Sequence, residues 1–165
     1  MAETVGGLRV SVKVTGTVTG TDGAMLPVNY SYERTFTEGT GTDQIGSVWK
    51  DDTRSLATTS EDLDIAGGVT DFQGAASAFN NVKVLWFQNL DTDSGDLFYL
   101  KPGSTAPVTS ILGGTTPTLT IGPGGLCLLI NPIDGYAVTA ASADKIAVQS
   151  ADNSDYQILI AGDNA

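Results

Sequence analysis

The sequence predicts an all-β fold: a single-domain β-sandwich of jelly-roll type, with about eight to ten strands and at most one short helix. Apolar and polar residues alternate along much of the chain, as they do in strands with one buried face. Turn residues recur between these segments at roughly 8–12-residue spacing, which is typical of short strands in a sandwich or barrel. No repeat of fixed period is present, which argues against a propeller or β-helix.

The chain of 165 residues fits one domain, 1–165, in which residues 1–7 are interpreted as a flexible N-terminal arm. The first two strands are predicted around residues 8–18 and 28–36, with a hairpin turn at Asp22-Gly23. Their apolar residues share one face: Leu8, Val10, Val12 and Val14, then Val28, Tyr30, Tyr32 and Phe36. We expect this face to be half-buried.

The middle of the chain contains weaker patterns. Residues 44–68 predict two short strands, with Leu63 and Ile65 opposite Asp62 and Asp64. Residues 70–79 predict one or two helical turns. The helical prediction rests on apolar residues at positions i, i+3, i+4 and i+7, namely Phe72, Ala75, Ala76 and Phe79.

From residue 82 the predicted strands are apolar on both faces. In "VKVLWFQN", Val84 and Trp86 face one way while Leu85 and Phe87 face the other. "DLFYLKP", "GLCLLIN" and "DYQILIAG" have the same character, and the shorter alternating segments "TLTIG" and "KIAVQ" lie between them. A strand that is apolar on both faces is covered on both, either within the domain or by a neighbouring subunit.

Composition argues against an enzyme. The chain has no histidine, and therefore lacks the commonest general base and metal ligand. No nucleophile elbow, phosphate-binding loop or zinc-binding cysteine pair is present, and the single cysteine, Cys127, cannot form an intrachain disulfide. We predict no catalytic residues and no cofactor. The net charge of −11 opposes nucleic-acid and anionic-membrane binding, and no apolar run reaches the roughly 20 residues of a membrane span.

The best candidate metal site is "DTDSGD", which carries Asp91, Asp93 and Asp96. Spaced aspartates beside a glycine can supply oxygen ligands to calcium, which prefers six to eight of them. The segment continues into an apolar strand rather than into further acidic ligands, so we interpret it as a hairpin loop. The aromatic residues Trp49, Trp86, Tyr30 and Tyr32 could form a sugar platform, but their alternation with aliphatic residues favours packing.

Several motifs resemble a family of small virion proteins of tailed bacteriophages, often encoded near the major capsid protein. They are "GTGTDQ", "WKDDTRSLA", "LDIAGGVTDFQG" and "VKVLWFQN" within residues 37–89. The C-terminal half is also similar, through "GPGGLCLLIN", "DGYAVT" and the final "DYQILIAG", although Tyr136 stands where another aromatic is usual. The resemblance implies a structural protein of the phage particle, located at the head surface and made in the host bacterial cytoplasm.

Within that family, we expect a homotrimeric capsid decoration (cement) protein that binds the major capsid protein. Many modest contacts on one shell would act together through multivalency. The polar, glycine-containing segments at 2–8 and 37–44 are the candidates for capsid or subunit contact: Ala2, Glu3, Thr4, Val5 and Leu8, then Thr37, Glu38, Thr40, Thr42, Asp43 and Gln44. The alternative is a tail, fibre or baseplate module that binds a host surface glycan.

Overall fold

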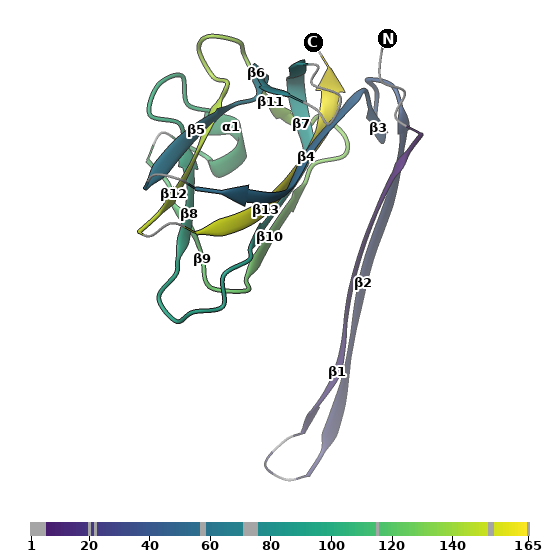
Figure 1. The fold of residues 1–165 in the computed structure, drawn as a ribbon. Helices are drawn as coiled ribbons and strands as arrows, with labels where there is room; N and C mark the ends of the chain where they lie inside the picture. Colours follow the sequence, from purple (N-terminus) through teal and green to yellow (C-terminus); the bar gives the residue numbers. More distant parts are fainter. Residues whose placement is uncertain are drawn as a thin grey trace.

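The fold is all-β, as the sequence predicts (Figure 1). A computed structural model describes residues 6–164 apart from positions 20, 22, 57–58, 71–75, 115 and 152–153. Over these residues it contains 13 strands, more than the expected eight to ten, and one four-residue helix, α1 (Thr109–Leu112). The single helix found there is far too short to cross a membrane. A jelly-roll topology stays a prediction.

Two sheets enclose one core. The six-stranded sheet has the order β10-β7-β13-β4, with β6 and β11 also paired to β7, and the four-stranded sheet has the order β5-β12-β8-β9. The first sheet contains β4 (Ser47–Ser55), β6 (Ala66–Thr70), β7 (Ala76–Asn89), β10 (Leu126–Ile130), β11 (Tyr136–Ala137) and β13 (Asp155–Asn164). The second contains β5 (Ser60–Asp64), β8 (Phe98–Pro102), β9 (Leu119–Ile121) and β12 (Lys145–Ser150). Buried apolar side chains from both sheets form a single cluster between them.

Three aromatic rings mark the centre of this core. Phe87 stacks on Tyr156 with ring centroids 4.9 Å apart, and Phe98 meets both rings edge-on at 5.4 and 5.3 Å. Phe87 and Tyr156 come from the six-stranded sheet and Phe98 from the four-stranded one, so the cluster joins the two layers. Edge-to-face and offset pairs of this kind stabilise a core by about 0.5–1.5 kcal/mol each beyond area burial.

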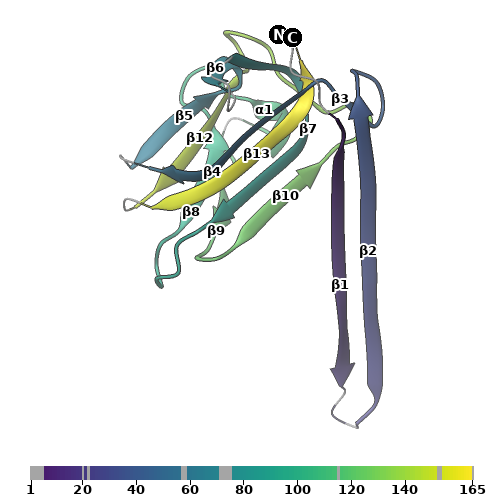
Figure 2. The ribbon, with the colours of Figure 1, turned by 45° about the vertical axis from the view of Figure 1, so that its right-hand side comes forward.

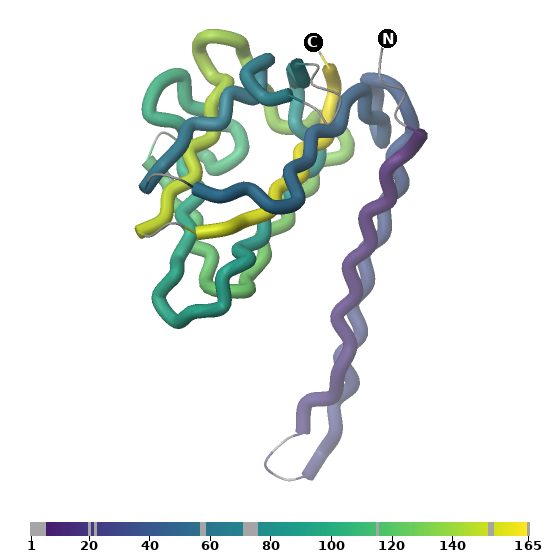
Figure 3. Tube along the Cα trace, in the orientation of Figure 1, coloured from purple at the N-terminus to yellow at the C-terminus, as the bar shows by residue number. Residues whose placement is uncertain are grey.

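The first two strands leave the sandwich as a long hairpin. β1 (Leu8–Thr19) and β2 (Met25–Glu38) pair antiparallel from Leu8 opposite Phe36 to Thr19 opposite Met25, and project from the body (Figures 1 and 2). We call residues 8–38 the hairpin arm; at about 3.4 Å per residue, its 12-residue first strand is roughly 40 Å long. Figure 3 shows the trace of the arm running well beyond the body.

The arm corrects an expectation from the sequence. Its apolar face was expected to be half-buried, but Val14 is 54% exposed and Tyr30 is 72% exposed, while Phe36 at the base is fully buried. The predicted pairing of the strands is present, but beyond the base no sandwich layer covers them. The other arm expected from the sequence, residues 1–7, lies mostly outside the described residues, with only Gly6 and Gly7 described.

Two further expectations are wrong. Residues 76–79, assigned to a helix by their spacing, begin strand β7, and Phe79 is buried in the core; positions 71–75 lie outside the described residues. Positions 44–68, expected to form two strands, contain β3 (Gln44–Ile45), β4, β5 and the start of β6. In both places pairing with neighbouring strands decides the local structure, because tertiary contacts commonly override local sequence preference.

Candidate functional site

The hairpin arm has one apolar and one polar face. Residues directly opposite each other in an antiparallel pair share a face, so the register sorts the arm into two sets. The apolar stripe consists of Val12, Val14, Val18, Leu26, Val28, Tyr30 and Tyr32. The other face is largely polar, with Arg9, Ser11, Lys13, Thr15 and Thr17 opposite Thr35, Glu33, Ser31, Asn29 and Pro27. This face also holds the Arg9–Glu33 ion pair, 2.6 Å between Nη2 and Oε2.

The apolar stripe is largely uncovered. Val18 is 56% exposed, Leu26 is 66% exposed and Tyr32 is 39% exposed, in addition to Val14 and Tyr30. Scattered apolar residues are common on protein surfaces, but a contiguous row of this length marks a surface that contacts another molecule. The arm is therefore the strongest candidate for a functional site in this chain.

At its base the same apolar face is covered by the outer side of the six-stranded sheet. Phe36 and Ile45 are fully buried there together with Val84 and Ala161 of the sheet. Partly buried apolar side chains complete this second cluster: Leu8, Val10, Val48, Leu128, Ile130 and Leu159. The predicted two-faced character of residues 82–89 is confirmed, because Leu85 and Phe87 face the sandwich core while Val84 faces the arm.

Beyond the arm base, the outer side of the six-stranded sheet is only partly covered. A groove of about 230 Å³ lies between the arm base and the sheet, lined on the sheet side by Val84, Trp86, Leu128 and Leu159. These side chains share the outer face because Trp86 pairs with both Leu128 and Leu159. Leu126, 53% exposed, extends the same face along β10. We call Trp86, Leu126, Leu128 and Leu159 the outer patch.

A buried lysine fixes the arm to the body. Lys83 on β7 is only 1% exposed, and its Nζ lies 2.8 Å from Asp163 Oδ1 on β13. The same ammonium donates to the carbonyl oxygens of Gly41 at 2.5 Å and Gln44 at 2.9 Å. A buried ammonium needs several acceptors to offset its lost hydration, and here two of the three come from the segment that follows the arm.

Residues 37–44, which comprise the last two residues of the arm and the turn after them, are held by internal hydrogen bonds. Gly39 N–H donates to Ile45 O, and Thr37 N–H donates to Asp43 O, both at 3.0 Å. Gln44 folds back so that its Oε1 accepts from Gly41 N–H at 2.8 Å. Gly39 has φ +139° and faces the Gln44 side chain, where a β-carbon would clash, so glycine is required there.

The interface residues predicted from the sequence fall into three groups. Ala2, Glu3, Thr4 and Val5 lie outside the described residues. Leu8 is half-buried at the arm base. Thr37, Glu38, Thr40 and Thr42 are exposed, whereas Asp43 and Gln44 are half-buried, and Asp43 pairs with Arg34 at 3.4 Å. The segment thus supports the arm, and it also presents four exposed polar side chains to solvent.

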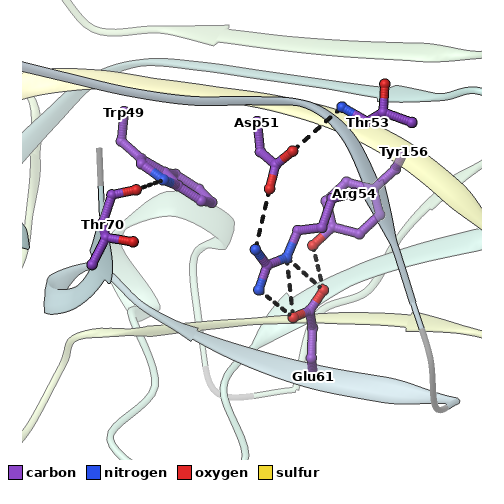
Figure 4. A network of polar contacts seen from close by, with 7 residues as sticks. All are labelled: Trp49, Asp51, Thr53, Arg54, Glu61, Thr70 and Tyr156. Carbon is purple, nitrogen blue, oxygen red and sulfur yellow. Dashed lines mark hydrogen bonds and ion pairs between the residues drawn. The ribbon is translucent and has the colours of Figure 1, made fainter. Parts of the chain in front are cut away.

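An ion-pair network joins the two sheets at the opposite side of the body (Figure 4). Arg54 on β4 donates from Nε and Nη2 to Glu61 on β5, with distances of 3.0 and 2.8 Å. Tyr156 on β13 donates from its hydroxyl to Glu61 Oε1 at 2.5 Å, and Arg54 Nη1 reaches Asp51 at 3.3 Å. Because β4 and β5 belong to different sheets, this network closes the sandwich along that edge.

The network shifts the ionisation of its members. Burial alone would raise the pKa of Glu61, but hydrogen bonds from Arg54 and Tyr156 and the charge of Arg54 outweigh it and hold that pKa below its ordinary value. Burial, together with the hydrogen bond to Glu61, raises the pKa of Tyr156 well above that of a free phenol. Glu61 is therefore a fixed anion and Tyr156 a fixed donor, which suits a structural role.

The other predicted candidates are placed as follows. Trp49 is 3% exposed and donates to Thr70 O at 2.9 Å, so its predicted packing is confirmed, whereas Tyr30 and Tyr32 are exposed and their predicted packing is wrong. The segment with Asp91, Asp93 and Asp96 links β7 to β8, which belong to different sheets, so it is not a hairpin loop.

Hydrogen bonds to the carboxylate of Asp91 and to the backbone of Asp96 fix this linking segment. Asp91 Oδ2 accepts from Asp155 N–H at 3.2 Å, and Asn89 Nδ2 donates to Asp96 O at 2.7 Å. Within the described residues no three acidic, cysteine or histidine side chains converge on a point that could hold a metal ion.

The sequence reasoning missed Lys83, Asp163, Arg54, Glu61 and Tyr156. One signal for Lys83 was present, since a single cation inside the apolar run "VKVLWF" must be paired if that strand is covered on both faces. Its acceptors come from positions about 40 and 80 residues away in the chain, which no local pattern reveals.

No protein-family model, curated protein or solved structure matches this chain. The arm, the outer patch and the charge distribution are therefore the features that bear on function.

Proposed function

We propose that this chain is a non-enzymatic structural protein of a bacteriophage particle, which as a homotrimer decorates the outer surface of the head and stabilises the shell. The hairpin arm is the observation that carries the proposal. An extended ribbon with an uncovered apolar stripe belongs to a protein that completes its packing by contact with other subunits. The family resemblance of residues 37–89 and of the C-terminal half supplies the phage context.

The charge distribution supports a role in assembly. Residues 39–165 carry 15 acidic and five basic side chains, a net charge of −10, whereas residues 1–38 carry four acidic and three basic ones, a net charge of −1. A strongly acidic body opposes non-specific association in solution and associates faster with a basic surface. The nearly neutral arm can approach either kind of surface without a large electrostatic penalty.

The body supports this role as a stable platform. Its core is closed by the aromatic cluster and by the network of Arg54, Glu61 and Tyr156. The major capsid protein is the proposed partner on the shell, and the exposed side chains of Thr37, Glu38, Thr40 and Thr42 are the proposed contacts beside the arm. Many copies on one shell make individually modest contacts effective.

The copy number of this protein in purified virions, relative to the major capsid protein, tests the proposal. Hundreds of copies at a fixed ratio to the capsid subunits are expected of a decoration protein. A few copies in multiples of three or six would overturn the head location and favour the tail, and absence from the particle would overturn the structural role.

A further inference from the structure

We propose that the apolar stripe of the hairpin arm binds the outer patch of a second copy of this chain. The two surfaces are both apolar and both carried by the same molecule. The stripe is largely exposed; in the patch Leu126 is exposed, and Trp86, Leu128 and Leu159 are half-buried. This proposal rests on the proposed function only for the number of copies, three. The contact itself should form in the free protein in solution.

The contact already exists in part within one chain. At the arm base, Leu8 and Val10 pack against Val84 on the outer side of the six-stranded sheet, with Leu128 and Leu159 beside them. The stripe continues the same face of the arm in the same alternation, from Val12 outward. The outer patch continues the same face of the sheet. The proposed interface therefore extends an observed packing arrangement with the same residue types on each side.

The arm covers only one edge of the patch of its own chain, where Leu128 and Leu159 are half-buried beside the arm base. The bonds from Lys83 to Gly41 O and Gln44 O hold the base of the arm, and the parallel pairing of Thr37 with Gln44 holds the end of β2. From this fixed base the arm runs away from the body and past its far end (Figures 2 and 3). A second copy is then the partner that the arm can reach with its stripe facing the patch.

The low charge of the arm allows this partner. The body is strongly acidic, so two bodies repel each other, but the first 38 residues carry a net charge of only −1. The outer patch itself consists of apolar side chains. It is bordered by Gln88 and Gln157, whose side chains are hydrogen-bonded at 2.8 Å, and by Lys50, which lies opposite Leu159 and is paired with Asp52. A patch whose only neighbouring charge on this edge is ion-paired accepts a nearly neutral ribbon without burying an unpaired charge.

The available area indicates a closed assembly. The eight pairs from Val12 outward span about 27 Å, and two strand spacings make the ribbon about 10 Å wide, which gives a flat face of roughly 270 Å². Counting both surfaces, one arm contact buries roughly 540 Å², below the roughly 1,000 Å² of a stable interface. A closed ring in which each copy gives one arm and receives one doubles the buried area per copy from roughly 270 to roughly 540 Å², so that a ring of three buries roughly 1,600 Å² in total.

A mixing experiment tests the contact directly. The single cysteine is first removed as Cys127→Ser, and two variants are made in that background: Val14→Cys in the apolar stripe and Leu128→Cys in the outer patch. Mixed under mild oxidation, they should form a disulfide-linked pair of unlike chains, which an intramolecular contact cannot produce. Thr15→Cys, the neighbouring exposed residue on the polar face, is the matched control.

Cross-linking through Val14→Cys with none through Thr15→Cys supports the proposal. Equal cross-linking of both, or of neither, overturns it. Tryptophan fluorescence adds a second readout, because Trp49 is buried within the body and Trp86 lies in the groove. Association should therefore reduce quenching of Trp86 by acrylamide, and unchanged quenching on dilution would contradict the proposed contact.

Sedimentation of the purified full chain gives the assembly state. The unmodified protein should sediment at a multiple of its 17.0 kDa chain mass, and Val14→Asp with Tyr30→Glu should sediment as a single chain. Thr15→Asp with Ser31→Glu on the polar face should leave the assembly intact. A monomeric unmodified protein, or an assembly unaffected by the stripe substitutions, would overturn the inference. These measurements use no capsids, so they can overturn the contact between copies while the protein still decorates the head. Equally, the virion copy number can overturn decoration of the head while the contact between copies stands.

Discussion

Lys83 and Asp163 form a buried ion pair across adjacent strands, with Nζ and Oδ1 2.8 Å apart and side chains 1% and 10% exposed. The same lysine donates to two carbonyl oxygens of the segment that follows the arm. One cation thus links β7, the penultimate residue of β13 and the segment that supports the arm. Together with the parallel pairing of Thr37 with Gln44 and the packing of Phe36, this group holds the base of the arm.

Replacing Lys83 with methionine should destabilise the fold by about 3–5 kcal/mol, because it leaves Asp163 and two carbonyls buried without their cation. Urea unfolding followed by tryptophan fluorescence measures the change. Lys50→Met is the matched control, since Lys50 pairs with Asp52 in solvent and should cost less than about 1 kcal/mol. Equal losses for the two variants would contradict the role assigned to Lys83.

The Glu61 network should make stability depend on pH in acid. The folded pKa of Glu61 is lowered below its ordinary value of about 4.3, so the unfolded chain takes up the proton first as the pH falls. The stabilisation by Glu61 is present in full above that value and is lost as the pH falls through the lower folded pKa. The urea midpoint of the unmodified protein should exceed that of Glu61→Gln at pH 7, and the difference should shrink towards pH 3.

Glu33→Gln provides the comparison for this pH series. Glu33 pairs with Arg9 on the exposed polar face of the arm, where both side chains are more than half exposed. Its replacement should shift the urea midpoint little at either pH. A difference for Glu61→Gln that stays constant between pH 7 and pH 3 would show that its carboxylate does not titrate as described.

The two ends of the arm should respond differently to truncation of an aromatic side chain. Phe36→Ala should cost about 3–5 kcal/mol, because Phe36 is fully buried between the arm base and the sheet. In the isolated chain, Tyr30→Ser should change the free energy of unfolding by less than about 0.5 kcal/mol, since Tyr30 is 72% exposed. Thermal unfolding at a concentration where the protein is monomeric measures both. A large loss for Tyr30→Ser would mean that the stripe is covered within one chain.

Removal of divalent cations should leave stability unchanged. The carboxylate of Asp91 accepts a hydrogen bond from the backbone N–H of Asp155, and the described acidic residues do not form a three-ligand cluster. The thermal midpoint should be the same with added calcium and with a chelator, while Asp91→Ala should cost about 1 kcal/mol through the lost hydrogen bond. A midpoint that rises with calcium would revive the metal-site hypothesis for Asp91, Asp93 and Asp96.

The alternating pattern predicts strands well but does not identify what covers them. In residues 82–89 it correctly indicates that Leu85 and Phe87 face the opposite way from Val84, because side chains alternate in any strand. In the arm the same alternation correctly predicts a shared face for Val14 and Tyr30. The burial was wrong because a pattern of period two is identical whether the cover is another layer of the domain or another molecule.

Long-range partners account for the rest. The spacing of Ala76 and Phe79 suits a helix, but pairing with β6 and β13 makes this segment a strand. The network of Arg54, Glu61 and Tyr156 joins residues up to about 100 positions apart, and nothing in the local sequence of Glu61 distinguishes it from a solvated carboxylate. The sequence therefore predicts only part of the candidate assembly surface. It identifies the residues that share one apolar face, but it does not predict that this face is exposed.

The place of β13 in the sheet has a consequence for the order of folding. Although it is the last described strand, β13 lies between β7 and β4 and pairs with both, so the six-stranded sheet cannot close until residues 155–164 are available. The arm pairs only with nearby sequence and can form early, whereas the body depends on contacts of long sequence separation, which form slowly. During synthesis, a ribbon with an apolar stripe thus emerges well before the body that carries it is complete, and this interval is when the chain is most exposed to aggregation.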